Sequence, residues 1–231
     1  VGANALDAST TASDNVAIGY EALGANTTGD LNTAVGRSAM SNTTNNDRNV
    51  AVGYAALQNI SDNQGDTYHT ALGYGAGNSI QTATQFTGVG ANAGLNLTTG
   101  NGNTFVGYNA GSATTTGAWN TVVGRSAFQS NTTGGTNVAV GTNTLQNNSG
   151  GNNNTAVGVD ALASNTSSGN SALGHSALAA NTSGSGNIAV GKGALLVNTN
   201  GNYNVAVGQN TLDASNASQN TAIGHEALSA N

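Results

Sequence analysis

The sequence predicts an all-β fold, a parallel β-roll or β-solenoid of about 14 coils with a period of 17 residues. The first observation is a five-residue motif, NVAVG at residues 49–53, whose close copies recur along the whole chain. The second is its spacing, because ten of the thirteen intervals between motif glycines are 17 residues long. A short fixed period indicates stacked units that cannot bury their apolar faces alone. The motif glycines are Gly2, Gly19, Gly36, Gly53, Gly73, Gly90, Gly107, Gly124, Gly141, Gly158, Gly174, Gly191, Gly208 and Gly224.

The third observation is that the residues before each motif glycine alternate as in a strand. The residue directly before the glycine is Val, Ile or Leu in every copy, and the residue three before it is β-branched in twelve of thirteen copies. A small residue, usually Ala, lies two before the glycine. Period-two alternation rich in β-branched residues is typical of β-strands. We therefore expect one short strand per coil, with the residue three before the glycine pointing inward.

Asn occupies the position four before the glycine in eleven of thirteen copies, with His69 and Phe86 in the other two. Asn bonds its own backbone and tolerates left-handed conformations, so it can start each strand from a turn. In a stack the same Asn falls above itself at about 4.8 Å, where amide side chains form ladders. We expect the Asn to serve the turn and the stack together. We interpret His69 as a substitution in this ladder rather than as a catalytic base.

The residues after the motif glycine follow a second pattern. The third position is Ala in twelve of fourteen copies and the fourth is Leu in nine. This apolar run is too short for a stable helix, so we favour coils of strands alone over coils that include a helix. A second short strand or a tight corner must then close each coil. Three successive coils carry Gly77, Gly94 and Gly111 in place of the Leu, and we expect Phe86 and Phe105 to fill the space.

Composition narrows the classes of function. The net charge is −6 with four basic residues in all, so no basic stripe exists for nucleic acid. The chain has no Cys, which excludes disulfides and thiolate chemistry. No apolar run approaches the roughly 20 residues that cross a bilayer, so we expect no membrane insertion in this segment. We interpret residues 1–231 as a single continuous repeat array, an excerpt of a longer chain, because solenoids need polar caps and none is visible.

Three strings carry a resemblance to known fibre repeats: NTAVGRSAM at 32–40, NTAVGVDAL at 154–162 and NTAIGHEAL at 220–228. They are similar to the NTAVGxxAL arrays of phage tail fibres and surface fibre proteins. They also resemble the head repeats of trimeric autotransporter adhesins. The resemblance covers the whole chain and implies a left-handed parallel β-roll in which three chains wind together. It further implies a scaffold role at a cell surface or on a virion, outside the cell.

The position directly after the motif glycine is variable but biased toward large aromatic and basic residues. Such residues are costly to bury, so we expect this column to face outward. Regularly spaced aromatic and cationic groups could stack on sugars or contact a receptor. The alternative is a solvated corner that accepts any large side chain. The candidate binding column consists of Tyr20, Arg37, Tyr54, Tyr74, Tyr108, Arg125, His175, Lys192 and His225.

The long interval between Gly53 and Gly73 contains DNQGD, a weak candidate for a metal site. Asp62 and Asp66 flank a glycine as in a Ca²⁺ loop, but the ligand set is incomplete, so we expect a simple loop insertion and no cofactor. His175 and His225 lie three coils apart and share no coil with a buried acid. We therefore expect no catalytic triad and no enzyme activity.

Each coil buries only two or three aliphatic side chains and two Ala, which barely offsets the cost of ordering the coil. Side-chain ladders or neighbouring chains must supply the rest of the stability. We expect a homotrimer formed through the small Ala and Gly face, with a monomer held by its own ladders as the alternative.

We predict a structural and adhesive fibre segment, from a bacterial surface adhesin or a phage tail fibre, that spans distance and presents a surface to a host receptor or glycan. An ice- or glycan-binding solenoid is one alternative. Ice binding needs an outward, unbroken Thr column, and the inward orientation expected above argues against it. A self-assembling extracellular filament subunit, joined end to end, is the other alternative.

Overall fold

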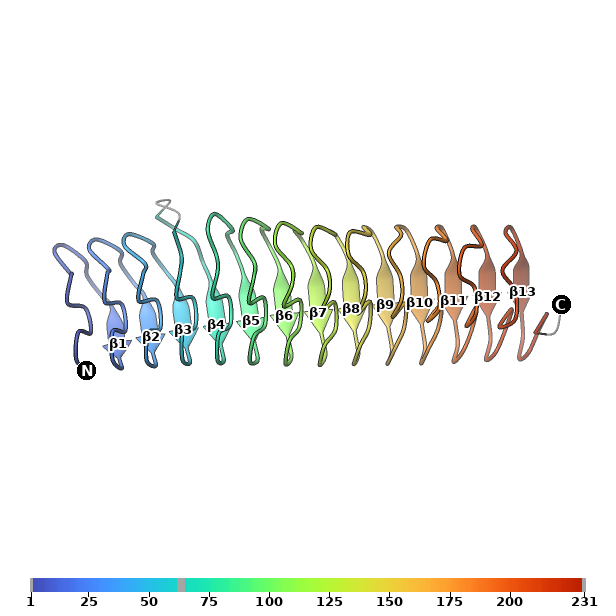
Figure 1. The fold of residues 1–231 in the computed structure, drawn as a ribbon, viewed down its shortest axis with the longest axis horizontal. Coiled ribbons are helices and arrows are strands. Elements are labelled where there is room, and N and C mark those ends of the chain that lie inside the picture. The colour runs from blue at the N-terminus through green and yellow to red at the C-terminus, as the bar shows by residue number, and fades with distance from the viewer. Residues whose placement is uncertain (1, 62–64, 230–231) are drawn as a thin grey trace. The chain divides into compact units, whose positions relative to one another are not determined.

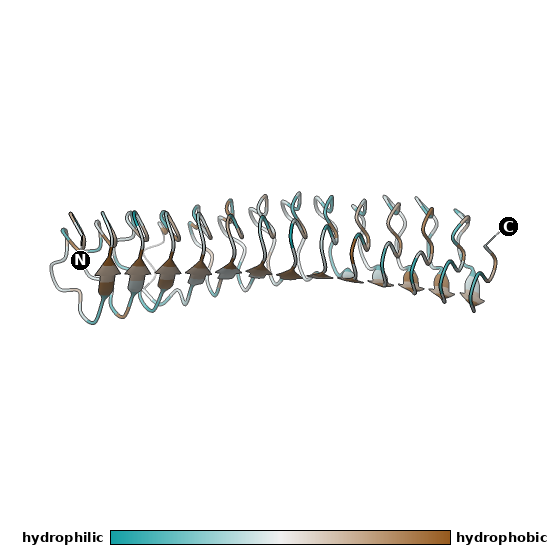
Figure 2. Ribbon diagram, turned by 90° about the horizontal axis from the view of Figure 1, so that it is seen from below, coloured by the Kyte–Doolittle hydropathy of each residue, from teal (hydrophilic) through white to brown (hydrophobic). Residues whose placement is uncertain are grey.

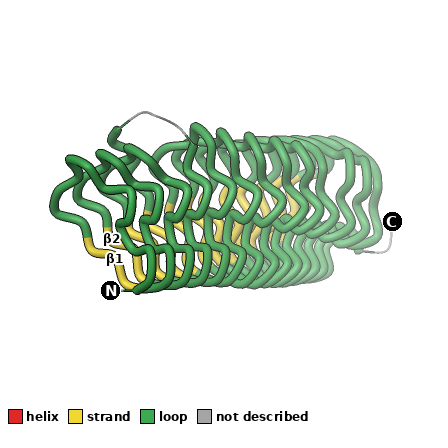
Figure 3. The backbone as a smooth tube through the Cα atoms, turned by 60° about the vertical axis from the view of Figure 1, so that its left-hand side comes forward, coloured by secondary structure: helices red, strands yellow, loops and turns green. Residues whose placement is uncertain are grey.

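The computed structural model describes residues 2–61 and 65–229, and this part of the chain is all-β and contains no helix. The chain divides into two compact units, Val1–Trp119 and Asn120–Asn231. In each unit every coil contributes one three-residue strand, and the strands gather on one side of the coils while turns form the rest (Figure 3). The prediction of a parallel β-solenoid with a 17-residue period is confirmed.

The first unit holds six strands that follow one another in chain order (Figure 1). Each pairs in parallel with the next, and equivalent residues of successive motifs face each other, as in Val16 with Thr33 and Thr87 with Thr104. The strands are β1 Val16–Ile18, β2 Thr33–Val35, β3 Val50–Val52, β4 Thr70–Leu72, β5 Thr87–Val89 and β6 Thr104–Val106.

The second unit repeats this arrangement with seven strands. Its parallel register again matches equivalent residues, as in Ala139 with Ala156 and Ala206 with Ala222. The strands are β7 Thr121–Val123, β8 Val138–Val140, β9 Thr155–Val157, β10 Ser171–Leu173, β11 Ile188–Val190, β12 Val205–Val207 and β13 Thr221–Ile223.

The direction in which the strand side chains point corrects one expectation. The middle residue of the strand faces the core, so Ala34 and Ala156 are fully buried, while the residues on either side, such as Val50 and Leu72, are exposed. The residue three before the glycine therefore points outward, not inward. The inward position holds Ala in ten of the thirteen strands and Gly88, Phe105 and Val122 in the other three. Figure 2 shows the strands largely in brown, the colour of hydrophobic residues.

The motif glycine is required by backbone shape and by close packing together. Gly174 has a φ of 139°, a region that L side chains rarely adopt. A Cβ atom built on it would lie 2.5 Å from the carbonyl oxygen of Gly191, the motif glycine of the next coil. Successive motif glycines thus stack backbone on backbone, which explains why this position alone never varies.

Tight turns, not a second strand, close each coil after the glycine. In the coil of Gly158, Asp160 and Leu162 adopt left-handed φ values of 56° and 51°. The backbone N–H groups then alternate: that of Ala161 donates to Gly158 within the coil, at 3.3 Å, and that of Leu162 donates to Ala177 of the next coil, at 3.0 Å. Left-handed Leu is unfavourable by itself, so burial of its side chain must offset the cost.

The expected Asn ladder is present and almost wholly buried. In the second unit, the Oδ1 atom of Asn170 accepts the backbone N–H of Asn187 at 3.0 Å and its Nδ2 group at 3.2 Å. The Nδ2 group of Asn187 also donates to the carbonyl of Gly201, in the turn that leads to the next coil, at 2.8 Å. The Asn therefore serves turn and stack, as expected. In that turn, however, the left-handed φ belongs to the residue directly before the ladder Asn and not to the Asn itself.

A second Asn ladder was not expected from the sequence. It lies seven residues after the motif glycine, where the Nδ2 group of Asn181 donates to Oδ1 of Asn165 at 2.7 Å and that of Asn198 to Asn181 at 3.3 Å. All three side chains are fully buried. In these coils the two ladders thus supply much of the polar stabilisation that the small core lacks.

The three coils without Leu are filled as predicted. Phe86 and Phe105 are fully buried, and their rings meet edge to face with centroids 6.0 Å apart. A Cβ atom at Gly94 would lie 2.7 Å from the Phe86 ring, and one at Gly111 would lie 2.6 Å from the Phe105 ring. The two Phe rings therefore occupy the volume that the Leu side chain fills in other coils.

Candidate functional site: an aromatic and cationic edge

The residues directly after the motif glycines form a column at the end of the strands. A backbone ladder sets their spacing, because the N–H of the following residue donates to the carbonyl of the column residue one coil earlier. In the first unit Ser38 donates to Tyr20 at 2.9 Å, and Gly75 donates to Tyr54 at 2.9 Å. The column therefore rises by one strand spacing, about 4.8 Å, per coil.

Four members of this column in the first unit stack directly on one another. The Arg37 guanidinium lies between two rings, 5.5 Å from the centroid of Tyr20 and 5.9 Å from that of Tyr54. The Tyr54 and Tyr74 rings are nearly parallel, with an interplanar angle of 7° and centroids 5.2 Å apart. Both arrangements are attractive, by cation–π and ring stacking. We call Tyr20, Arg37, Tyr54 and Tyr74 the ring ladder.

The ring ladder ends at Ala91, and an aromatic residue returns one coil later at Tyr108. The backbone ladder continues through this point, since Asn92 donates to Tyr74 at 2.8 Å and Asn109 donates to Ala91 at 3.0 Å. Tyr74 and Tyr108 are 59% and 52% exposed, more than the other two tyrosines of the column. A methyl group thus stands where a ring would complete the column.

The second unit carries the same column without aromatic rings. The structure brings His175 and Lys192 onto successive coils, with Gly193 donating to His175 at 3.0 Å. Arg125 and His225 lie elsewhere in the column and are exposed, as are His175 and Lys192. Nδ1 of His175 lies 3.0 Å from the Ser176 hydroxyl, and Nε2 of His225 lies 3.8 Å from the Glu226 carboxylate. These neighbours are local, so we see a polar edge here rather than a stacked one.

Sequence reasoning missed a second set of large residues, five before the motif glycine. Tyr203 rests on the turn of the preceding coil, where a Cβ atom at Gly186 would lie 2.7 Å from its ring, and Trp119 covers Gly102 in the same way. Most of these residues share a left-handed φ near 55° to 60°. Their signal in the sequence was weak because the position also holds Gly, Asp, Gln and Thr. The large members are Leu31, Arg48, Tyr68, Trp119 and Tyr203.

The outer face of the strands exposes aliphatic and Thr side chains in each unit. Two columns of side chains cover it, one from the first and one from the third residue of each strand, and none of these residues is charged. Its exposed members include Val16 and Ile18 in the first unit and Leu173 and Ile188 in the second. The expected Ala and Gly face is not available for association, because those Ala side chains lie inside the coil.

A shallow hollow interrupts this outer face in the second unit. It has a volume of about 150 Å³ and lies around Ser171 and Ala172, with Thr155, Leu173 and Val190 on its rim. Ser171 is the one residue of the first column that is not β-branched. Its small side chain leaves the space that Val or Thr fills in neighbouring strands.

The DNQGD insertion falls partly outside the described residues, which exclude Asp62. Asp66 pairs with Arg48 and accepts a hydrogen bond from the Tyr68 hydroxyl at 3.0 Å. The Arg48 guanidinium lies 6.0 Å from the Tyr68 ring centroid. Asp66 is thus engaged by a cation and a phenol. Across residues 2–61 and 65–229, no group of three or more His, Asp or Glu residues is arranged to hold a metal ion.

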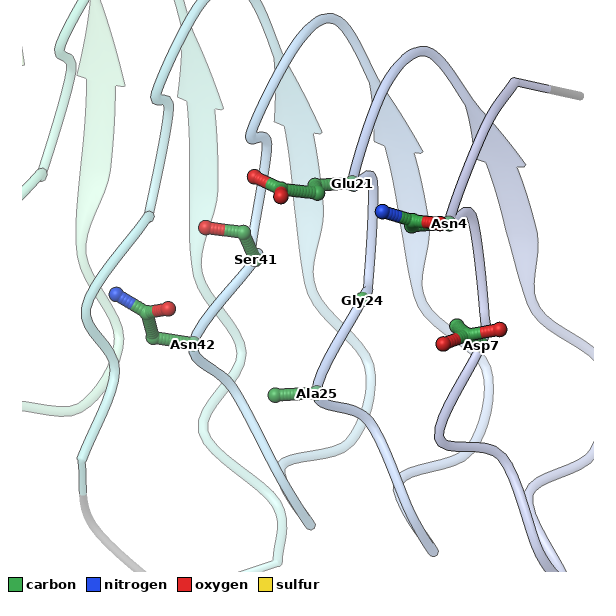
Figure 4. Close-up of a pocket in the computed structure, with 7 residues that line it drawn as sticks. All are labelled: Asn4, Asp7, Glu21, Gly24, Ala25, Ser41 and Asn42. Atoms are coloured by element: carbon green, nitrogen blue, oxygen red, sulfur yellow. The ribbon is translucent and has the colours of Figure 1, made fainter.

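A polar pocket of about 310 Å³ opens on the turns of the first three coils. Figure 4 shows Asn4 and Asp7 on the first coil, Glu21 on the second, and Ser41 and Asn42 on the third. The small residues Gly24 and Ala25 line its floor and leave it open to solvent. The two carboxylates have no third acidic or imidazole partner there.

His69 takes the place of Asn in the first buried ladder. Its backbone N–H donates to Oδ1 of Asn49 at 2.8 Å, and its Nδ1 accepts the N–H of Phe86 at 3.2 Å. Burial lowers the pKa of His69 to about 4, opposed by the backbone of Ala83. The ring is therefore neutral at pH 7 and acts as a ladder acceptor, which agrees with its interpretation as a substitution in the ladder.

Comparisons with protein-family models, with curated proteins and with solved structures found no match to this chain. Within the residues that the structure describes, no helix of the length and hydropathy needed to span a membrane is found. The outer strand face and the ring ladder are therefore the two surfaces from which a function can be inferred.

Proposed function

We propose that this chain is a structural and adhesive fibre segment of a bacterial surface or a virion, in which three copies associate through their outer strand faces and hold the ring ladder outward. The fibre spans distance, and the ladder contacts a receptor or glycan outside the cell. No chemistry is required of the segment in this role.

The observation that carries the proposal is the outer strand face itself. The core of each coil is filled from inside, in most coils by Ala and Leu, so the outward Val, Ile and Leu side chains contribute little to it. Exposed contiguous apolar surface on a soluble chain marks an interaction site. Because the face repeats with the strand spacing and bears no charge, a second copy offers a matching surface along the whole length of each unit.

Sedimentation equilibrium of the chain tests the proposal. We expect about three times the single-chain mass of 22.5 kDa, because burial of the apolar face requires partners. Leu173→Lys combined with Ile188→Lys places two charges on that face and should yield the single-chain mass. Both side chains are exposed in one chain, so the variant should keep the coil intact.

Ser130→Lys is the matched control, since it adds a charge at an exposed turn position away from the strands. It should retain the wild-type mass. A wild-type chain that sediments at 22.5 kDa over the whole concentration range would overturn the proposal.

An ice-binding face is a second candidate, because the structure removes the argument against it. Thr70, Thr87 and Thr104 point outward on β4, β5 and β6 and lie in register at the strand spacing. Regular outward hydroxyl and methyl groups could order water. Val50 precedes these residues in the same column, so the unbroken run of Thr in the first unit is confined to three strands. An ice-recrystallisation assay tests it: inhibition that Thr87→Tyr abolishes would support it, and no inhibition would remove it.

A further inference from the structure

We infer that Tyr54 and Tyr74 form an oxidative cross-linking site, at which a one-electron oxidant joins the two side chains as dityrosine. A haem peroxidase supplied with hydrogen peroxide is an oxidant of this class. The link clamps the coil of Gly53 to the coil of Gly73. The inference goes beyond the fibre proposal and is independent of it, because it concerns two coils of one chain.

The backbone holds the two tyrosines one strand spacing apart. The strands β3 and β4 pair in register up to Val52 and Leu72. Tyr54 and Tyr74 each follow two residues later. The N–H of Gly75 donates to the Tyr54 carbonyl at 2.9 Å, so the parallel ladder continues past the tyrosines. Their Cα atoms therefore lie about 4.8 Å apart.

The two rings lie face to face and are open to solvent. Their planes differ by 7° and their centroids lie 5.2 Å apart. Because the rings are nearly parallel, the Cε carbons beside the two hydroxyl groups are separated by a similar distance. Tyr54 is 46% exposed and Tyr74 is 59% exposed, and exposed side chains change rotamer within nanoseconds. A tilt of the two rings toward each other therefore brings one Cε atom of each into contact.

The other tyrosines lack such a neighbour. The described residues, 2–61 and 65–229, include all six tyrosines, and no other two tyrosine rings meet there. The Arg37 guanidinium lies between Tyr20 and Tyr54, so these two phenols are kept apart. The Tyr68 hydroxyl donates to Asp66. Coupling within one chain is therefore directed to a single pair.

The reaction needs an oxidant that accepts single electrons and no other group. Each phenol gives up one electron and one proton and becomes a phenoxyl radical, whose unpaired electron is shared with the Cε carbons. A new carbon–carbon bond forms between one Cε atom of each ring. The hydrogens on these two carbons then move to the oxygens and restore both hydroxyl groups. In total the chain loses two hydrogen atoms, and one molecule of hydrogen peroxide is reduced to two molecules of water.

The position of the pair gives the link a structural effect. The interval between Gly53 and Gly73 is 20 residues, the longest between motif glycines, and the chain has no Cys with which to close it. A covalent bond across this interval closes a loop and so reduces the number of conformations open to the unfolded chain. The cross-linked chain should therefore melt at a higher temperature than the untreated chain.

Treatment of the whole chain with a haem peroxidase and hydrogen peroxide tests the inference. We expect dityrosine fluorescence, a chain mass lower by two hydrogen atoms, and migration at the single-chain mass under denaturing conditions. An Asp-specific protease cuts between the two tyrosines, at Asp62 and Asp66, and should leave the two fragments joined. The melting temperature of the product should exceed that of the untreated chain.

Two variants separate this pair from general oxidation of tyrosines. Tyr54→Phe keeps a ring that can stack but has no hydroxyl group to oxidise, so it should abolish both the fluorescence and the rise in melting temperature. Tyr108→Phe is the matched control, because Tyr108 belongs to the same column, is 52% exposed and meets no other tyrosine ring. It should cross-link as the wild type does.

Four results would overturn the inference. They are a treated wild type without dityrosine, dityrosine that joins only separate chains, a Tyr54→Phe variant that cross-links as the wild type does, and a cross-linked chain that melts no higher than the untreated one. The mass of the native chain in solution does not enter any of these results. A monomer that forms the link therefore contradicts the fibre proposal alone, and a trimer that does not form it contradicts this inference alone.

Discussion

The Oδ1 atom of Asn137 accepts two hydrogen bonds from Asn154, one from the backbone N–H at 2.9 Å and one from Nδ2 at 3.1 Å. The two residues are 17 positions apart in the chain and adjacent in the stack. This pairing fixes the register of one coil on the next, since a coil shifted by one residue would lose both bonds and leave buried amides without partners.

Asn154→Ala should therefore lower the free energy of unfolding by about 2–4 kcal/mol. The change removes the acceptor of the Asn170 N–H and the donor to the carbonyl of Ser167, both about 2.9 Å away in the wild type. Urea unfolding followed by circular dichroism measures it. Asn147→Ala, at an exposed turn position, should change stability by less than about 0.5 kcal/mol. Equal effects of the two substitutions would contradict a structural ladder.

Gly174→Ala should destabilise the coil by at least about 3 kcal/mol, because the new methyl group meets the Gly191 carbonyl in a backbone region that Ala avoids. The neighbouring atoms are backbone and cannot move aside without separating the coils. Gly150→Ala provides the comparison. Its nearest neighbour is the Thr133 hydroxyl at 3.1 Å, a side chain that can rotate, so a change of about 1 kcal/mol or less is expected. Urea unfolding of the two variants measures both changes. A small loss of stability for Gly174→Ala would show that the coils are not in backbone contact there.

The filling role of Phe105 can be tested by replacing Phe105 and Gly111 with the residues that most other coils have at these two positions. Phe105→Ala should cost about 3–5 kcal/mol, and Gly111→Leu should also destabilise because Leu would collide with the Phe105 ring. The double variant has Ala and Leu at the positions where most coils have them. It should be more stable than either single variant, with a coupling of at least about 2 kcal/mol. Additive losses in a double-mutant cycle would mean that the two positions do not share one volume.

His69 should make stability depend on pH. Its pKa is about 4 in the folded chain and about 6.5 unfolded, so below pH 6.5 only the unfolded state takes up the proton. Stability is therefore full above pH 6.5 and falls by up to about 3 kcal/mol as the pH drops toward 4. Unfolding free energies at pH 7 and 4.5 measure the loss. His69→Asn should remove the part of this loss of stability that comes from His69. The carboxylates, His175 and His225 are present in both chains, so their contribution cancels in the comparison. An identical pH slope in the variant would refute the assignment.

The sequence predicted the strands, the stacking of the coils and the first Asn ladder, because each depends on a residue type that repeats in phase. It also predicted the filling role of Phe86 and Phe105, which stand where the Leu of other coils is missing. It did not predict which side of the strand is buried. Alternation alone places Ala34 opposite Thr33 and Val35 but does not say which side has space, and that depends on the width of the coil. The β-branched residues were expected inside, yet the inward position is the one that Ala holds in most strands.

The candidate site was predicted as a column but not as a stack. The recurrence of large residues after the motif glycine showed that they share an edge, whereas the contacts of Arg37 with Tyr20 and Tyr54 depend on side-chain rotamers that a sequence does not contain. The second Asn ladder escaped notice because its position also holds Ile60, Ile80 and Leu97 in the first unit. Because this position holds Asn in some coils and Ile or Leu in others, its sequence pattern does not indicate a buried ladder, and only the structure shows that the position is buried.

Successive coils lie directly upon one another, so equivalent residues rise by one strand spacing per coil. The chain has no Cys, so pairs of introduced cysteines can carry spin labels at chosen column positions of the second unit. Electron–electron distance measurements, with labelled chains diluted among unlabelled ones, should give about 19 Å between Arg125→Cys and Lys192→Cys and about 29 Å between Arg125→Cys and His225→Cys, four and six spacings apart. Distances that do not grow in this proportion would contradict the stacked arrangement and the functions inferred from it.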